Sequence, residues 1–150
     1  MIPSPRKMDQ GFTLIELLIV VAIIGLLAMI AIPNLLSASR KSEYTRAAAD
    51  TRLAVTQAIV YAGDKNVYPN SIKVIRDAYL MNLSDNDPWR VPYVLSPSLM
   101  ASTRPGNSDD VYIYSKGAAA VGIYPDPFVN DTGSLGSVGY SSVYGSWSGN

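Results

Sequence analysis

The sequence predicts an α+β fold in which a long, kinked N-terminal α-helix packs on a small antiparallel β-sheet. Three observations support this prediction. Residues 12–32 form an almost uninterrupted apolar run, and residues 44–62 place small and apolar side chains at the spacing of one helical face. Short alternating segments separated by turn-forming residues follow from residue 91 onward. We expect the first half of the helix to be transmembrane and the second half to be amphipathic.

The composition argues against several classes of function. The 150 residues include 12 basic and 12 acidic side chains, no His and no Cys. A net charge of zero argues against a nucleic-acid-binding protein, which needs cations to neutralise phosphates. Without His and Cys there is no Ser-His-Asp or Cys-His arrangement, no thiolate metal site and no disulfide framework. No pattern orients the scattered acids for acid–base chemistry, so we predict that the chain is not an enzyme.

The apolar run 12–32 predicts a membrane-spanning helix. At about 1.5 Å per residue its length is ~31 Å, which matches the ~30 Å thickness of the hydrocarbon layer. A buried core helix is the alternative, but a small domain does not need a helix that is apolar on every face. A secretory signal peptide fits less well, because the run is too long, contains an acid and has no evident cleavage site after it. We therefore expect an anchor that stays attached.

Glu16 is the only charged residue of the run. A carboxylate inside the membrane is costly, so Glu16 is a candidate for function. Its position near the start of the run leaves a structural alternative, in which the side chain reaches the lipid headgroups. Arg6 and Lys7 precede the run, whereas Arg40 and Lys41 follow it, so charge alone does not fix the orientation of the span.

Residues 11–18 read GFTLIELL and resemble the processing motif of the type IV pilin superfamily, which includes the pseudopilins of type II secretion. The resemblance implies that a prepilin peptidase cleaves between Gly11 and Phe12 and methylates the new amino group of Phe12. Residues 1–11 would then be a cytoplasmic leader. In the family, the residue at the position of Glu16 pairs with the N-terminal ammonium of a subunit already in the filament. Pairing of the same two groups within one subunit is the alternative.

The predicted helix has two weak points and a defined end. Pro33 removes a backbone donor and clashes with the preceding turn, which predicts a kink or local unwinding, and Gly25 is a second hinge candidate. The helical pattern resumes after Pro33 and ends near Ala62, with Gly63 as the expected C-terminal cap. The whole helix would then be on the order of 75 Å long.

Residues 63–150 are expected to form the globular domain that covers the apolar face of the helix. A short helix capped by Asn70 or Ser71 comes first. The strand candidates are residues 91–95, 110–114, 119–124 and 138–144. The complete predicted organisation is a cleaved leader at 1–11, a transmembrane and assembly half at 12–32, an amphipathic half at 33–62, and the domain at 63–150.

Two segments of this domain resemble major pseudopilins. Residues 87–93 read DPWRVPY, where those proteins have Asp-Pro-Trp-Gly-x-Pro-Tyr, and residues 110–117 match their Asp-x-x-x-x-Ser-x-Gly segment. Arg90 replaces the expected Gly, and three Ala residues at 118–120 stand where an Asp-Gly pair usually follows. The resemblance implies a pilin fold.

In the family the region after the second segment binds calcium. The residues here that could form a displaced calcium site are Asp126, Asn130 and Asp131. Calcium needs six to eight oxygen ligands, several of them carboxylates. A turn-forming role for these three residues is the more common alternative. A calcium cofactor is therefore a possibility that the sequence leaves open.

The resemblance implies a structural subunit that polymerises into a helical filament, most closely a major pseudopilin that drives protein export. The implied partners are copies of the chain, the prepilin peptidase, an inner-membrane assembly platform and minor pseudopilins, with no nucleic acid. The implied location is the bacterial inner membrane, with the C-terminal domain in the periplasm. One alternative is a type IV pilus major pilin for adhesion, motility or DNA uptake. An alternative of another class is a membrane-anchored extracytoplasmic binding domain.

Overall fold

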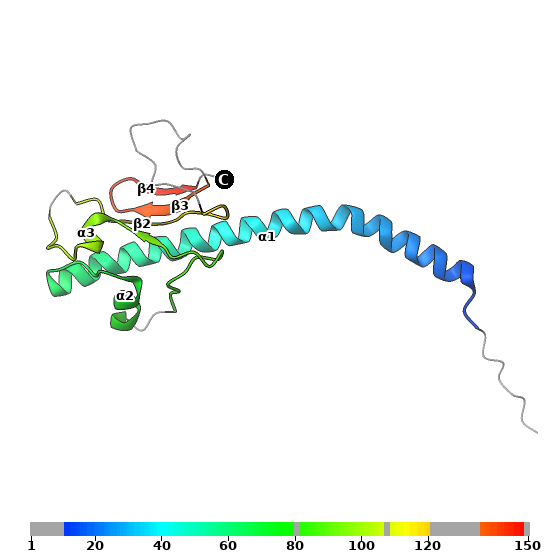
Figure 1. Cartoon of the computed structure of the whole chain (residues 1–150), viewed down its shortest axis with the longest axis horizontal. Coiled ribbons are helices and arrows are strands. Elements are labelled where there is room, and N and C mark those ends of the chain that lie inside the picture. Colours follow the sequence, from blue (N-terminus) through cyan, green and yellow to red (C-terminus); the bar gives the residue numbers. More distant parts are fainter. Residues whose placement is uncertain (1–10, 80–81, 107–108, 121–135, 149–150) are drawn as a thin grey trace, which may run out of the picture. The chain divides into compact units, whose positions relative to one another are not determined.

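The computed structural model describes residues 11–79, 82–106, 109–120 and 136–148 of the chain. Over these residues the fold is α+β, as predicted, with a long N-terminal helix and a small antiparallel sheet (Figure 1). The helices are α1 (Leu14–Lys65), α2 (Ile72–Tyr79) and α3 (Pro97–Met100), and the strands are β1 (Val94–Leu95), β2 (Tyr112–Ser115), β3 (Val138–Ser141) and β4 (Gly145–Ser148). The chain forms two compact units, Met1–Ser39 and Arg40–Asn150, and α1 contributes to both.

Helix α1 is continuous over 52 residues and passes through both Gly25 and Pro33. The local unwinding expected at Pro33 does not occur, and the Ser37 hydroxyl donates a hydrogen bond to the Pro33 carbonyl at 3.1 Å. The expected cap at Gly63 is wrong, because the helix continues to Lys65. Asn66 ends it instead, with a φ of 55° and its N–H bonded to the Ala62 carbonyl at 2.9 Å. Asn is one of the few residues with a side chain that visit this left-handed conformation routinely.

The four described strands form one sheet in the order β1-β2-β3-β4, and every neighbouring pair is antiparallel. Three strand candidates fall on β1, β2 and β3, with ends shifted by a few residues. The fourth candidate, 119–124, is not confirmed, because 119 and 120 lie in a turn and residues 121–124 lie outside the described residues. Strand β4 was not expected, and it pairs with β3 in the Gly- and Ser-rich tail.

The tail holds a strand because one glycine makes room for a tryptophan. A Cβ atom at Gly139 of β3 would lie 2.6 Å from the indole ring of Trp147 and 2.5 Å from the Cβ of Tyr114. Without that atom, the ring of Trp147 packs across β3, and its Nε1–H donates to the Ser137 hydroxyl at 3.0 Å. The contact gives β4 an aromatic anchor that composition alone does not reveal.

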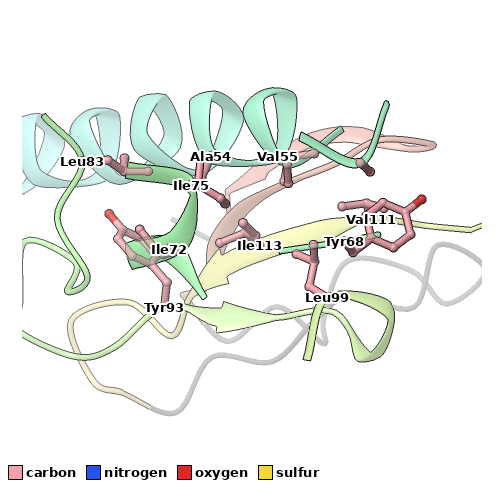
Figure 2. Close-up of a cluster of buried hydrophobic side chains, with 12 residues drawn as sticks. Ala54, Val55, Tyr68, Ile72, Ile75, Leu83, Tyr93, Leu99, Val111 and Ile113 are labelled. Carbon is pink, nitrogen blue, oxygen red and sulfur yellow. The ribbon is translucent and has the colours of Figure 1, made fainter. Parts of the chain in front are cut away.

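The core lies between the second half of α1 and the sheet, within the unit Arg40–Asn150. Figure 2 shows Ala54 and Val55 of α1 directed toward Ile113 of β2. The buried residues of α1 are Ala47, Thr51, Ala54, Val55, Ala58 and Ala62. They follow the predicted helical stripe, although Tyr44 and Ala48 at its start are only half-buried. Their small side chains let the sheet and the loops approach the helix closely.

Candidate functional site

The three described residues before α1 are exposed and lie outside regular secondary structure. Gly11, Phe12 and Thr13 precede the first residue of the helix, and the Phe12 side chain is 73% exposed. A Cβ atom added at Gly11 would meet no other atom within 4 Å. The described part of the chain therefore imposes no steric need for glycine at position 11, and both residues of the Gly11–Phe12 peptide bond are exposed.

Thr13 and Glu16 form a reciprocal cap at the start of α1. The Thr13 backbone N–H and hydroxyl donate hydrogen bonds to Oε2 of Glu16 at 2.9 and 2.7 Å. The Glu16 N–H donates in return to the Thr13 hydroxyl at 3.3 Å. This capping box satisfies backbone donors that the first turn of a helix leaves free. In the single chain, the carboxylate of Glu16 is thus held by its own helix terminus.

The first half of α1 carries large apolar side chains that the chain does not cover. Those more than half exposed include Leu14, Ile15, Leu17, Leu18, Val21, Ile24, Leu27, Ile30, Leu35 and Leu36. Its most apolar window has no buried residue, and α1 is the one helix in the described part of the chain that is long and apolar enough to cross a membrane. Such a surface needs a partner outside the chain, either lipid or other protein.

The two further segments singled out from the sequence are joined by one buried carboxylate. Asp87 is 5% exposed, and its Oδ1 accepts hydrogen bonds from the N–H groups of Trp89 at 3.0 Å and Val91 at 2.8 Å. Its Oδ2 accepts a hydrogen bond from the Ser115 hydroxyl at 2.5 Å, and that hydroxyl also accepts one from the Gly117 N–H at 2.9 Å. Because every contact of this network is internal to the fold, we interpret both segments as structural.

Known proteins share both the N-terminal segment and much of the domain with this chain. Residues 6–32 match the family model described as the prokaryotic N-terminal methylation motif. The chain is 28% identical to type II secretion system core protein G of Aeromonas hydrophila over 109 residues, 61% of this chain and 76% of that protein. The corresponding protein of Pseudomonas aeruginosa is 28% identical over 130 residues, 75% of this chain and 86% of that one.

The type IV wide pilus major component PilA4 of Thermus thermophilus is 47% identical over 62 residues, 41% of this chain and 47% of that protein. The chain is a homologue of type II secretion core protein G and of type IV pilins. No solved structure matches it significantly. The N-terminal motif of this pilin homologue implies processing by a prepilin peptidase and assembly into a filament.

The structure brings some of the residues selected from the sequence together and leaves others apart. Gly11, Phe12 and Glu16 lie at the start of α1, whereas Gly25 and Pro33 lie inside its exposed half. The candidate calcium ligands Asp126, Asn130 and Asp131 lie outside the described residues. Over the described ranges, no group of three or more acids could hold a metal ion.

Thr13 is a functional candidate that sequence reasoning missed. Its spacing to Glu16 is the Thr-x-x-Glu pattern that precedes an apolar run at a helix start, so the signal was present in the sequence. The hydrogen bonds of Thr13 make it the partner of Glu16 within a single subunit.

Proposed function

We propose that this pilin homologue is the major subunit of a type II secretion pseudopilus and that it resides in the bacterial inner membrane before assembly. The observation that supports this proposal most strongly is that the methylation motif overlaps the uncovered apolar part of α1. The methylation motif at residues 6–32 extends into the first half of α1, which among the described residues is the segment that is long and apolar enough to cross a membrane and is left uncovered. Copies of that segment packed against one another would bury the same surface that lipid covers before assembly.

Processing is proposed to occur between Gly11 and Phe12, followed by methylation of the new amino group of Phe12. Residues 1–11 would be a cytoplasmic leader, with Arg6 and Lys7 near the membrane face. The accessible bond between Gly11 and Phe12 supports this step. Because no described residue restricts the size of residue 11, we assign the glycine requirement to the peptidase rather than to the fold of the subunit.

Glu16 is proposed to exchange partners during assembly. Before assembly its carboxylate accepts the two hydrogen bonds from Thr13. In the filament it would accept the Phe12 ammonium of a neighbouring subunit. An unpaired carboxylate in a low-dielectric interior is strongly unfavourable, so the pairing would penalise a subunit inserted at the wrong axial position. The domain at 63–150 and the second half of the helix at 33–62 would be displayed around this core, and Gly25 and Pro33 would allow the packed helices to bend.

The relatives favour the pseudopilus over the surface pilus. The core protein G relatives match this chain over 76% and 86% of their own length, whereas the Thermus pilus component matches over 47% of its length. We therefore place the domain in the periplasm and infer a non-enzymatic, scaffolding role in protein export. An inner-membrane assembly platform and minor pseudopilins would be its partners. A type IV pilus subunit is the second candidate, favoured by the higher identity over the N-terminal segment.

The test is the mass of the mature chain after co-expression with a prepilin peptidase. We expect loss of residues 1–11 and gain of one methyl group on Phe12. A Gly11→Leu variant should keep its full length and remain in the membrane. A mature chain that still begins at Met1 in the presence of active peptidase would contradict the proposal. Electron microscopy of sheared cell-surface fractions then separates the two candidates, since abundant surface fibres at normal expression favour the pilus.

Calcium binding at Asp126, Asn130 and Asp131 also stays a proposal with a simple test. A ligand that binds only the folded state raises the melting temperature with its concentration. A melting temperature that is the same with excess calcium and with a chelator would exclude a stabilising site.

A further inference from the structure

Trp89 connects a loop of the domain to the middle of α1, where the unit Arg40–Asn150 begins. Its Nε1–H donates a hydrogen bond to Oε2 of Glu43 at 2.9 Å. Its ring packs edge-on against Tyr44, with the ring centroids 4.7 Å apart. These contacts place the next residue, Arg90, beside the part of α1 that begins with Arg40. Figure 1 shows the loop that precedes β1 running back along α1 toward this part of the helix.

Four cations gather at this end of the domain, and we call them the basic cluster: Arg40, Lys41, Arg90 and Lys116. Arg40, Lys41 and Arg90 are exposed. Lys116 is adjacent to Gly117, whose Cβ position lies 3.3 Å from the hydroxyl oxygen of Tyr44. None of the ion pairs between described residues includes a member of the cluster.

The nearby acids keep their charge, but among the described residues none of them forms an ion pair with the basic cluster. Glu43 accepts the hydrogen bond of Trp89. Asp87 is buried and accepts three hydrogen bonds. The Oδ2 atom of Asp50 lies 3.8 Å from the Nε atom of Arg46 and accepts a hydrogen bond from the Tyr93 hydroxyl. Since Asp50 is paired with Arg46, the four cations of the basic cluster outnumber Glu43 and Asp87, and the end of the domain that carries Arg40 keeps a positive balance of charge.

Arg90 holds a backbone conformation that its side chain does not explain. Its φ is 66°, in the left-handed region that favours glycine, and its N–H donates to the Asp87 carbonyl at 3.0 Å to close the turn. A glycine would make the same turn without steric cost. The exposed guanidinium contributes no ion pair to the described fold. A strained residue whose side chain does nothing for the fold is a candidate for an external contact.

The position of the basic cluster along α1 identifies that contact. The dense series of exposed large apolar side chains in the first half of α1 ends at Leu36, and Arg40 follows four residues later in the same continuous helix. Four residues correspond to about 6 Å of helix, which is about the depth of the headgroup layer on one side of a bilayer. Trp and Tyr are enriched at the same depth, where Trp89 and Tyr44 would lie.

We propose that the basic cluster binds anionic phospholipid headgroups at the membrane face from which the domain emerges. The proposal rests on the membrane-resident stage of the proposed function and adds a lipid preference to it. Phosphate groups would pair with the guanidinium and ammonium groups, and Arg suits this role because it can bind phosphate oxygens in a bidentate manner. The subunit would then leave an anionic membrane less readily than a neutral one.

The experiment uses the full chain reconstituted in vesicles of phosphatidylcholine, with or without phosphatidylglycerol. A Trp147→Phe background leaves Trp89 as the single tryptophan, since the chain has 2. Quenching of Trp89 by a headgroup nitroxide lipid reports its contact with the membrane surface. We expect stronger quenching with phosphatidylglycerol, and we expect high salt to remove the difference. Equal quenching in both kinds of vesicle would overturn the proposal.

Arg90→Gly is the decisive variant because it removes a cation and relieves the backbone at once. It should lower the ratio of docked to undocked domain about fivefold in anionic vesicles, with thermal stability unchanged or increased. Arg104→Gln is the control, because it removes an exposed cation near the opposite end of α1 from the basic cluster. The carbonyl of its neighbour Thr103 accepts a hydrogen bond from the N–H of Tyr68, which follows the last residue of α1. Unchanged quenching in Arg90→Gly, or an equal loss in Arg104→Gln, would refute the role of the cluster.

Two further outcomes separate this proposal from its alternatives. Quenching that depends on the density of protein in the vesicle, and not on the lipid, would assign the cluster to contacts between copies and overturn the lipid assignment. Extraction of the chain from all vesicles by alkaline carbonate would instead contradict membrane residence itself. A chain that stays inserted but shows no lipid preference would leave the proposed function standing and remove only this inference.

Discussion

The two halves of α1 bury apolar surface in opposite ways, although they belong to one continuous helix. The second half buries small residues such as Ala54 and Ala58 beneath the sheet and loops of its own domain. The first half carries Leu, Ile and Val side chains, and its most apolar window has no buried residue. Where the partner is part of the chain, small residues allow close approach. Where the partner is external, large side chains cover every face of the helix.

This contrast predicts that the second half of α1 carries the stability of the fold and that the first half carries assembly. Substitutions in the second half should change the free energy of unfolding of the domain and leave membrane insertion unchanged. Substitutions in the first half should change filament formation and leave the domain intact.

Replacing Glu16 should give the largest loss of assembly. Under the proposed pairing, Glu16→Ala would leave a neighbouring ammonium without its partner in a low-dielectric interior, and we expect filament yield to fall by about tenfold or more. Glu16→Gln is the informative companion, because glutamine keeps the capping box with Thr13 but carries no charge. Sedimentation of filaments from detergent-solubilised membranes measures the yield, and mass analysis verifies that cleavage is unaffected. Normal filament yield from Glu16→Gln would mean that the cap matters and the charge does not.

One pair of matched substitutions makes the same chemical change in the first half of α1 and in the sheet that covers its second half. Ile113 of β2 is fully buried against α1, so Ile113→Ala should lower the free energy of unfolding by about 2–5 kcal/mol. Ile24 lies in the first half and is 59% exposed, so Ile24→Ala should change it by less than about 0.5 kcal/mol. Urea unfolding in detergent, followed by tryptophan fluorescence, measures both. Similar losses in both variants would show that the first half packs on the domain.

Periodicity made the helix and its buried stripe predictable from the sequence. The spacing from Thr51 to Ala62 fixes one face of a helix whatever the partner is, and the structure buries that face. The end of the helix was less predictable, because Gly63 and Asn66 are both acceptable terminators and local sequence does not rank them. Strand β4 was missed because its anchor is the contact between Trp147 and Gly139, which are brought together only by the pairing of β3 with β4.

In the candidate site, too, local sequence patterns predicted some residues and missed the contacts that tertiary packing creates. Gly11, Phe12 and Glu16 were selected because a short motif specifies them in order along the chain. Thr13 could have been selected by its capping spacing to Glu16. The union of Asp87 with Ser115, and the approach of Trp89 to Glu43, join residues far apart in sequence. Such pairings follow from tertiary packing, which no local pattern encodes.

A smaller effect is expected where the domain holds the second half of α1 through a polar contact. The buried Tyr93 hydroxyl donates to Oδ2 of Asp50 at 3.2 Å, and burial, followed by the charge of Asp50, raises the pKa of Tyr93 well above its ordinary value. Tyr93→Phe should lower the free energy of unfolding by ~1 kcal/mol at neutral pH. The raised pKa makes the contribution of Tyr93 complete below about pH 10 and lost progressively above it.

Thermal melts of both proteins from neutral to alkaline pH measure this contribution. The difference in the free energy of unfolding between wild type and Tyr93→Phe should shrink as the pH rises beyond about 10. Above this pH, Tyr93 of the unfolded wild type ionises and favours unfolding, whereas the variant has no ionisable group at this position. The other tyrosines are common to both proteins and cancel in the difference. A difference that stays constant with pH would mean that the Tyr93 proton does not link the domain to α1.

A change of about the same size tests the loop that carries Arg90. Arg90 has a φ of 66°, so Arg90→Gly should raise the free energy of unfolding by ~1 kcal/mol, even though it deletes a whole side chain. Arg104 is not among the described residues with positive φ, and Arg104→Gly should instead be neutral or slightly destabilising, because glycine gives the unfolded chain more freedom. Urea midpoints at constant slope measure both changes. If Arg90→Gly unfolds more easily than wild type, the guanidinium supports the domain from within, and it belongs with the second half of α1 rather than with the membrane surface.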